Sequence, residues 1–159
     1  MAKNILADKI LIIDFGSQYT QLIARRVREL GVYCEIYNHR ASLKSIKDFN
    51  AKGIILSGGP ETVKQKGSPK IPDKVFDLGI PLLGICYGMQ SIAKQLKGKV
   101  ELGDKREFGH ADLLLKNKGS GLFKGINNNK ISVWMSHGDH VSKLPRDFKV
   151  CATTNNSPI

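Results

Sequence analysis

The segment Gly84-Ile85-Cys86-Tyr87-Gly88 places a thiol between two glycines. Residues 81–85 form an apolar run typical of a buried strand, and residues 87–97 repeat apolar side chains at helical spacing. A nucleophile at a strand-to-helix turn needs unusual backbone angles and close packing, which flanking glycines permit. A helix N-terminus also favours a thiolate over a thiol. We therefore predict that Cys86 is a nucleophile; the alternative is a structural cysteine between two packing glycines.

A second glycine pair, in Ser57-Gly58-Gly59-Pro60, follows another predicted strand. Sites in parallel sheets form outside the carboxyl ends of the strands, so we expect this loop to lie near Cys86. Its backbone N–H groups, beside that of Tyr87, could receive an oxyanion. A plain tight turn is the alternative. A phosphate-binding loop is excluded because no Gly-Lys-Ser/Thr follows.

A thiolate nucleophile also needs a general base, and the chain offers four histidines: His39, His110, His137 and His140. His137-Gly138-Asp139-His140 combines two imidazoles with a carboxylate, which raises the possibility of a metal site. Zinc requires three or four ligands, and no cysteine or third clustered histidine supplies the rest. We predict no metal here, and expect a surface loop that contributes substrate contacts.

The remaining cysteines, Cys34 and Cys151, lie in apolar strand patterns, and we predict that both are small core residues. Three widely spaced cysteines without Cys-x-x-Cys exclude a disulfide scaffold and favour a reducing cytoplasm. No signal peptide or membrane-spanning run is visible.

The elements that must position these groups alternate along the first part of the chain. We predict strands and helices in turn, which implies a mostly parallel sheet with helices on both faces. The predicted strands cover residues 9–14, 32–37, 53–57 and 81–85, and the predicted helices cover 17–30, 42–49, 72–78 and 87–97. After Gly98 the pattern changes to strands at 111–115, 130–135 and 148–152, joined by Gly- and Asn-rich turns.

The length and composition of the chain fit one globular domain of this α/β class. The chain has 159 residues and a mass of 17.6 kDa, with 41% apolar and 25% charged residues. The net charge of +11 invites a nucleic-acid interpretation. The lysines are scattered, however, and no segment alternates basic with aromatic residues, so a basic solvated surface is favoured.

Together these motifs resemble the class I (triad-type) glutamine amidotransferase family, which has a flavodoxin-like fold. Within it, the chain is similar to the N-terminal glutaminase domains of GMP synthetases. The Gly-x-Cys-x-Gly and Ser-Gly-Gly-Pro elements are shared across the class. The matching segments, which span almost the whole chain, are Ile-Leu-Ile-Ile-Asp-Phe-Gly-Ser-Gln-Tyr-Thr-Gln-Leu-Ile-Ala-Arg-Arg-Val-Arg-Glu (10–29), Gly-Ile-Ile-Leu-Ser-Gly-Gly-Pro-Glu (53–61), Gly-Ile-Cys-Tyr-Gly-Met-Gln (84–90), Arg-Glu-Phe-Gly (106–109) and Trp-Met-Ser-His-Gly-Asp (134–139).

The resemblance implies hydrolysis of glutamine to glutamate and ammonia. Cys86 would attack the side-chain amide and form a γ-glutamyl thioester, while the N–H groups of Gly59 and Tyr87 hold the oxyanion. The residues implied to bind glutamine are Gly58, Gln90, Ser136, His137, Gly138 and Asp139.

The implied partners are L-glutamine and a synthetase domain in the same chain or a separate subunit. That domain would use ATP and Mg²⁺ to aminate XMP to GMP, and the full-length protein would be a cytoplasmic homodimer. This domain itself is expected to need no cofactor.

The sequence departs from the family in one respect. The family's catalytic His and Glu come from a Gly-x-Gln-Phe-His-Pro-Glu segment, which these residues do not contain. We therefore expect residues 1–159 to be a C-terminally incomplete amidotransferase domain, without the synthetase domain, that hydrolyses glutamine very poorly. A non-catalytic or regulatory amidotransferase-like module is the alternative. A cysteine hydrolase or peptidase on a similar fold is disfavoured by the segments at 106–109 and 134–139.

Overall fold

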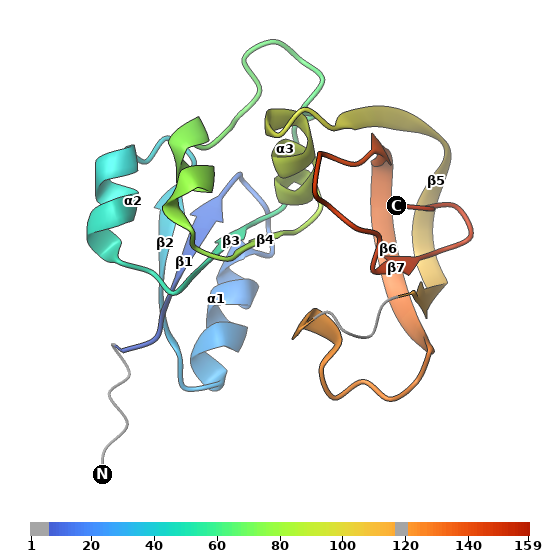
Figure 1. Cartoon of the computed structure of the whole chain (residues 1–159), viewed down its shortest axis with the longest axis horizontal. Coiled ribbons are helices and arrows are strands. Elements are labelled where there is room, and N and C mark those ends of the chain that lie inside the picture. The colour runs from blue at the N-terminus through green and yellow to red at the C-terminus, as the bar shows by residue number, and fades with distance from the viewer. Residues whose placement is uncertain (1–6, 117–120) are drawn as a thin grey trace. The chain divides into compact units, whose positions relative to one another are not determined.

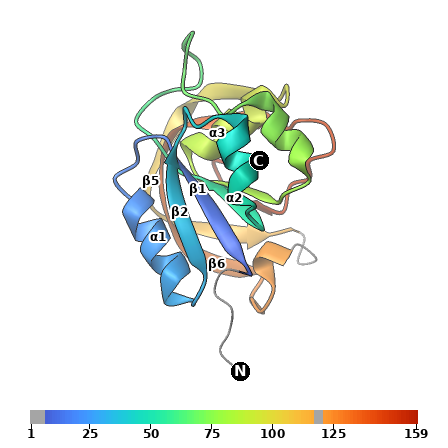
Figure 2. The same cartoon turned by 90° about the vertical axis from the view of Figure 1, so that its left-hand side faces the viewer.

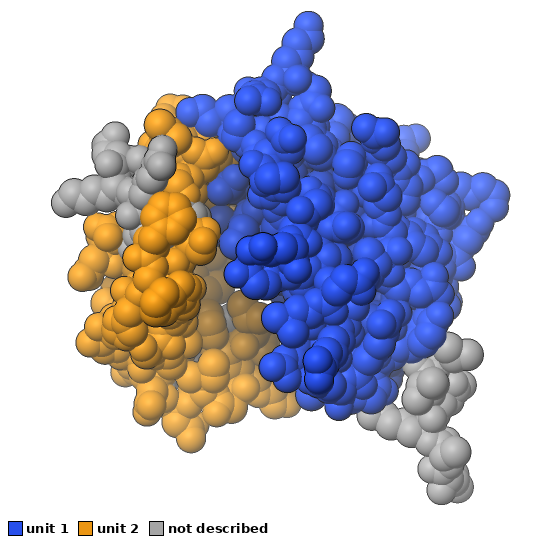
Figure 3. Space-filling model, turned by 180° about the vertical axis from the view of Figure 1, so that it is seen from behind, with its two compact units in different colours: residues 1–95 blue, residues 96–159 orange. Residues whose placement is uncertain are grey.

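A computed structural model describes residues 7–116 and 121–159, with the backbone alone at 103–107 and at position 137. The chain forms two compact units, residues 1–95 and residues 96–159, which are coloured separately in Figure 3. Each unit has its own sheet, so each is described by itself.

The first unit is built on a four-stranded parallel sheet with the order β2-β1-β3-β4 (Figure 1). Its strands are β1 (Lys9–Asp14), β2 (Tyr33–Asn38), β3 (Gly53–Leu56) and β4 (Leu82–Gly84). The central strand β1 is covered on both faces: Leu11, Ile12 and Ile13 are at most 1% exposed. This burial explains why β1 is a continuous apolar run rather than an alternating pattern.

Helices cover both faces of this sheet, as the sequence predicts. They are α1 (Thr20–Glu29), α2 (Leu43–Phe49), the 3₁₀ helix η1 (Asp73–Leu78) and α3 (Tyr87–Gln95). Figure 2 shows α1 and α2 on opposite sides of β1 and β2. The chain moves from β1 to β2 in one direction along the sheet and then returns past β1 to reach β3. Because both crossovers are right-handed, this reversal places the two connecting helices on opposite faces of the sheet.

Local sequence sets the ends of these helices. Ser42 caps α2, since its hydroxyl accepts a hydrogen bond from the Ser45 N–H at 3.1 Å. Gly31, with a left-handed φ of 73°, follows α1. The helix predicted at 72–78 is a 3₁₀ helix rather than an α-helix.

The prediction that Cys34 is a core residue is confirmed. Its side chain is 1% exposed and packs with Ile12 and Ala24 between β1, β2 and α1. The Cys34 thiol donates to the Ala24 carbonyl at 3.4 Å.

The second unit is a three-stranded antiparallel sheet with the order β6-β5-β7. It contains β5 (Lys99–Leu115), β6 (Lys130–Lys143) and β7 (Ala152–Thr153), with the 3₁₀ helix η2 (Gly121–Phe123) between β5 and β6. The strands β5 and β6 are longer than the sequence predicts, because cross-strand pairing carries them through polar positions that lack a strand pattern.

Three predictions for this unit are wrong. The strand expected at 148–152 is reduced to Ala152–Thr153, and Cys151 lies before it, half-buried rather than in the core. The segment 137–140, expected to be a surface loop, lies within strand β6, where pairing with β5 fixes its backbone.

Candidate active site

The strand-to-helix turn at Cys86 has the strained backbone of a nucleophile elbow. Cys86 lies between β4 and α3 with a φ of 48°, in the left-handed region that non-glycine residues rarely adopt. Hydrogen bonds hold this turn against β3: the N–H of Ile85 donates to the Leu56 carbonyl at 2.9 Å, and that of Gly88 to the Ser57 carbonyl at 3.0 Å. These surrounding contacts therefore hold Cys86 in its strained backbone conformation.

The two glycines beside Cys86 are required by close backbone contacts. A Cβ atom at Gly84 would lie 2.6 Å from the Met89 nitrogen, and one at Gly88 would lie 2.3 Å from the Leu56 carbonyl oxygen. Both atoms belong to backbone and cannot move aside easily. The glycines thus let α3 start directly against β3 and β4.

The loop after β3 passes beside the thiol, as expected for strand ends in a parallel sheet. A Cβ atom at Gly58 would be only 3.6 Å from the Cβ of Cys86. One at Gly59 would be 2.6 Å from the Phe15 carbonyl oxygen, so Gly59 lies against the loop that follows β1. The loops at the carboxyl ends of β1, β3 and β4 therefore meet beside Cys86, one strand away from the point between β1 and β3 where the strand order reverses.

A polar network that sequence reasoning missed joins the loops after β1 and β3. The Asp14 carboxylate accepts hydrogen bonds from the Gly16 N–H at 2.9 Å and the Thr20 hydroxyl at 2.7 Å. The Ser57 hydroxyl, fully buried, accepts from the Phe15 N–H at 3.0 Å. The sequence pattern that could have predicted this network is that Asp14 and Ser57 each lie at the carboxyl end of a buried apolar run.

Tyr87 follows Cys86 directly, and both its backbone and its side chain have defined surroundings. As the first residue of α3, it has an N–H without an intrahelical acceptor. Its side chain is 2% exposed, with the ring 5.1 Å from that of Phe15 and the hydroxyl donating to the Pro69 carbonyl at 2.6 Å. Gln90, one turn further along α3, is also buried.

The Cys86 thiol is exposed, yet the protein around it removes enough water to raise its pKa above the ordinary value. This effect opposes the thiolate preference expected from the helix N-terminus. Among the described residues of the first unit, none forms a hydrogen bond with this sulfur. His39, the histidine of this unit, stacks its ring on Phe15 with 5.8 Å between centroids.

The other predicted glutamine-binding residues lie in the second unit. Ser136, Gly138 and Asp139 are on β6; Ser136 is exposed, and the other two are half-buried. The backbone of His137 pairs with Glu107, and a register shift separates this pair from Leu102 and Asp139. The side chains of His137, and of Arg106 and Glu107 in the Arg-Glu-Phe-Gly motif, lie outside the described residues.

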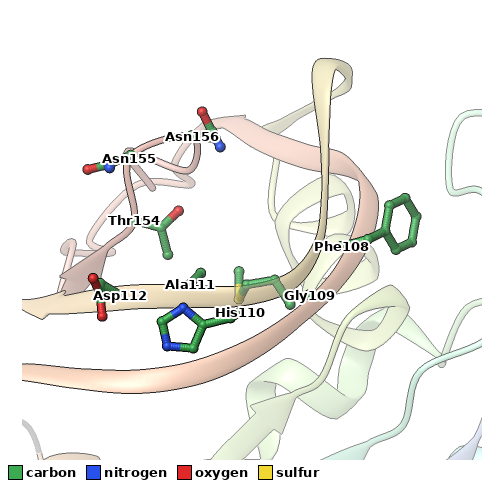
Figure 4. Close-up of a pocket in the computed structure, with 9 residues that line it drawn as sticks. Phe108, Gly109, His110, Ala111, Asp112, Thr154, Asn155 and Asn156 are labelled. Atoms are coloured by element: carbon green, nitrogen blue, oxygen red, sulfur yellow. The ribbon is translucent and has the colours of Figure 1, made fainter.

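The second unit also has a cavity of about 290 Å³ that the sequence did not predict. Its walls are β5, Met135 of β6, and the turn after β7, as Figure 4 shows for most of the lining residues. The turn is closed by hydrogen bonds of 3.0 Å from the Thr154 N–H to the Ser157 carbonyl and from the Ser157 N–H to the Thr154 hydroxyl. The lining residues are Phe108, Gly109, His110, Ala111, Asp112, Met135, Thr154, Asn155 and Asn156.

The described residues offer neither a metal cluster nor a membrane-spanning helix. Over 7–116 and 121–159, no group of three or more His, Cys, Asp or Glu side chains is arranged to hold a metal ion. Within the same ranges, no helix has the length and apolarity to span a membrane.

The family and fold found by comparison with known proteins are consistent with the nucleophile elbow and the parallel sheet. The family model for class-I glutamine amidotransferases matches residues 11–159. The chain belongs to the class-I glutamine amidotransferase family. Its predicted fold, a mostly parallel sheet with helices on both faces, is that of the solved structures it resembles.

Relatives and solved structures give the same assignment. The chain is 56% identical over 160 residues to a glutamine-hydrolysing GMP synthase of Stenotrophomonas maltophilia, and 52% identical over 166 residues to that of Hahella chejuensis. These matches cover 98% and 100% of this chain but only 30% and 32% of the relatives. The chain therefore spans about a third of the length of these relatives.

Among solved structures, a Thermoplasma acidophilum protein described as a candidate GMP synthase subunit matches with a TM-score of 0.80 and 31% identity, covering 94% of this chain and 74% of that one. A glutamine amidotransferase from Thermotoga maritima matches with a TM-score of 0.73 and 20% identity, covering 94% of this chain and 68% of that one. The second likeness concerns the fold alone.

Proposed function

We propose that this chain is the glutaminase part of a GMP synthase, with Cys86 as the nucleophile. The observation that carries the proposal is the left-handed φ of Cys86 at the start of α3, directly beside Gly58. A strained, exposed thiol with glycine neighbours suits attack on a bound carbonyl carbon. Similarity to proteins named glutamine-hydrolysing GMP synthases favours an enzyme over a non-catalytic module.

In the proposed reaction, the Cys86 sulfur bonds to the side-chain amide carbon of L-glutamine. The carbon–nitrogen bond then breaks, ammonia leaves after gaining a proton, and water hydrolyses the thioester to glutamate. The amide carbon must lie about 3 Å from the sulfur to gain the rate advantage of an aligned reaction.

The N–H groups of Gly59 and Tyr87 are proposed as the oxyanion hole. Two observations support this: Tyr87 is the first residue of α3, so its N–H lacks an intrahelical acceptor, and Gly59 follows Gly58, which adjoins Cys86. On the family resemblance, we also propose glutamine-binding roles for Gly58, Gln90, Ser136, His137, Gly138 and Asp139.

A general base is needed to complete this chemistry. Since burial raises the pKa of the Cys86 thiol, the sulfur is largely protonated at neutral pH and must transfer its proton before it attacks. None of the four histidines matches the family's catalytic histidine, so we assign the base to none of them. The 159-residue chain is therefore expected to hydrolyse glutamine very poorly.

In the whole protein, we propose that the ammonia passes to a synthetase domain, which aminates XMP to GMP with ATP and Mg²⁺. The relatives' greater length leaves room for such a domain. We place the homodimeric protein in the cytoplasm and assign no cofactor or metal to the present residues.

The test is affinity labelling with a chloroketone analogue of glutamine, mapped by mass spectrometry. The sulfur of Cys86 should form a bond to the carbon that carries chlorine, and chloride should leave. L-glutamine should protect Cys86 from the label, and L-asparagine should not. Cys151, half-buried and remote from the elbow in sequence, is the internal control.

Two results would contradict the proposal. One is labelling of Cys151 ahead of Cys86. The other is labelling of Cys86 at the same rate with and without L-glutamine, because it would show a reactive thiol without a glutamine site.

A further inference from the structure

One face of α3 holds the long segment that follows the glycine loop. Tyr87 donates its hydroxyl hydrogen to the Pro69 carbonyl at 2.6 Å. The Gln95 amide donates to the Ile71 carbonyl at 2.9 Å, and the Lys94 ammonium donates to the Val63 carbonyl. Positions 87 and 94 lie on the same side of the helix, two turns apart, and position 95 is rotated by about 100° from position 94. Three contacts thus hold residues 63–71 against the helix that begins at the nucleophile.

The polar groups along this face are mutually satisfied. The segment and α3 enclose a cavity of about 410 Å³, and the side chains at its wall bond one another: Ser91 with Gln95, and Gln95 and Lys70 with the Asp73 carboxylate. The face therefore serves to hold the segment in place.

Tyr87 differs from the other two anchors because its ring also contacts Phe15, the residue that adjoins the other proposed oxyanion donor, Gly59. The ring packs on Phe15 with 5.1 Å between centroids, and Gly59 lies against the Phe15 backbone, where an added Cβ would be 2.6 Å from the carbonyl oxygen. Its hydroxyl contact at Pro69 fixes the same chain ten residues after Gly59. The Tyr87 side chain is thus linked to Gly59 in two ways: through Phe15, on which its ring packs, and through Pro69, which its hydroxyl bonds.

We propose that the Tyr87 side chain is a positioning group for the oxyanion hole. By holding Pro69, its hydroxyl keeps the Gly59 loop in register with the start of α3, so that the two N–H groups point at one oxygen. This inference rests on the proposed glutaminase function.

The test compares Tyr87→Phe with the unmodified chain. Phenylalanine keeps the packing on Phe15 and removes the hydrogen bond to Pro69. Tyr33→Phe is the matched control, since the Tyr33 hydroxyl makes a hydrogen bond of 2.7 Å to Glu35 on β2, away from the elbow.

Two reagents distinguish an effect on the Cys86 thiol from an effect on the proposed oxyanion hole. Iodoacetamide requires only the Cys86 thiolate, whereas the chloroketone analogue of glutamine also places a carbonyl oxygen at the proposed N–H groups. Since loss of an oxyanion donor costs about 10²–10³ in rate, a displaced donor should slow chloroketone labelling by about tenfold. Iodoacetamide labelling should change less than about twofold, and Tyr33→Phe should change neither.

The rate of trypsin cleavage gives an independent measure of how firmly residues 63–71 are held. Lys64, Lys66 and Lys70 lie within or beside the anchored residues, and cleavage there requires local release. Tyr87→Phe should speed cleavage at these lysines several-fold, and Tyr33→Phe should not.

The outcomes are distinct. Chloroketone labelling that is unchanged in Tyr87→Phe overturns the positioning role, as does an equal loss with both reagents, which would place the effect on the thiol. Failure of L-glutamine to protect Cys86 in the unmodified chain rejects the proposed function itself, whatever the variants do.

Discussion

Replacing Gly88 by alanine should destabilise the first unit, because this glycine lies where α3 touches β3. The new methyl carbon would be 2.3 Å from the Leu56 carbonyl oxygen and 2.7 Å from both the Leu56 carbonyl carbon and Cβ. Ordinary contacts begin at 3.4 Å, so helix and strand must separate by about 1 Å. Leu56 is fully buried, which leaves the strand little freedom to move.

The cost can be estimated from two effects. Overpacking of this kind costs about 1–3 kcal/mol. The same displacement stretches the 3.0 Å hydrogen bond from the Gly88 N–H to the Ser57 carbonyl; because this N–H also donates to the Ile85 carbonyl at 2.9 Å, the loss costs at most about 1 kcal/mol. Gly88→Ala should therefore lower the free energy of unfolding by about 1–4 kcal/mol.

Urea unfolding followed by far-ultraviolet circular dichroism measures this change, because α1, α2 and α3 all lie in the first unit. Gly58→Ala is the matched control. Its methyl group would be 3.6 Å from the nearest atoms, an ordinary contact, so stability should change by about 0.5 kcal/mol or less. If Gly88→Ala is no more destabilising than Gly58→Ala, the contact with Leu56 does not fix the elbow and the steric reasoning is refuted.

Three further predictions concern the thiols. Gly58→Ala should slow alkylation of Cys86 by iodoacetamide, because its methyl group would contact the Cys86 Cβ; an unchanged rate would argue against that proximity. Since burial raises the pKa of the Cys86 thiol, its alkylation rate should keep rising past pH 8.5 or so, and a midpoint below the free-cysteine value would contradict this. With limiting iodoacetamide, mass spectrometry should find label on exposed Cys86 before half-buried Cys151 and last on buried Cys34; label on Cys34 first would be inconsistent with the fold.

Much of the first unit follows from local sequence patterns. Apolar runs bounded by turn residues predict its four strands, and their alternation with helices predicts a parallel sheet. The sheet then places the loops after β3 and β4 at one edge, so the proximity of Gly58 and Cys86 can be predicted without coordinates. The second unit is less predictable, because β5 and β6 are held by cross-strand pairing that extends through polar residues, including Ser136 and Asp139.

The sequence by itself determined the nucleophile candidate, the glycines around it and the order of strands and helices, since each depends on neighbouring residues. Only the tertiary structure decided the left-handed backbone at Cys86, the hydrogen bond that ties Phe15 to Ser57, and the contact of Tyr87 with Pro69. The two hydrogen bonds join positions far apart in the chain, 42 residues for the first and 18 for the second, and the backbone at Cys86 is held by hydrogen bonds to β3, which is also distant in the chain. Local propensity carries no information about such pairs, because their energy exists only once the sheet has brought them together.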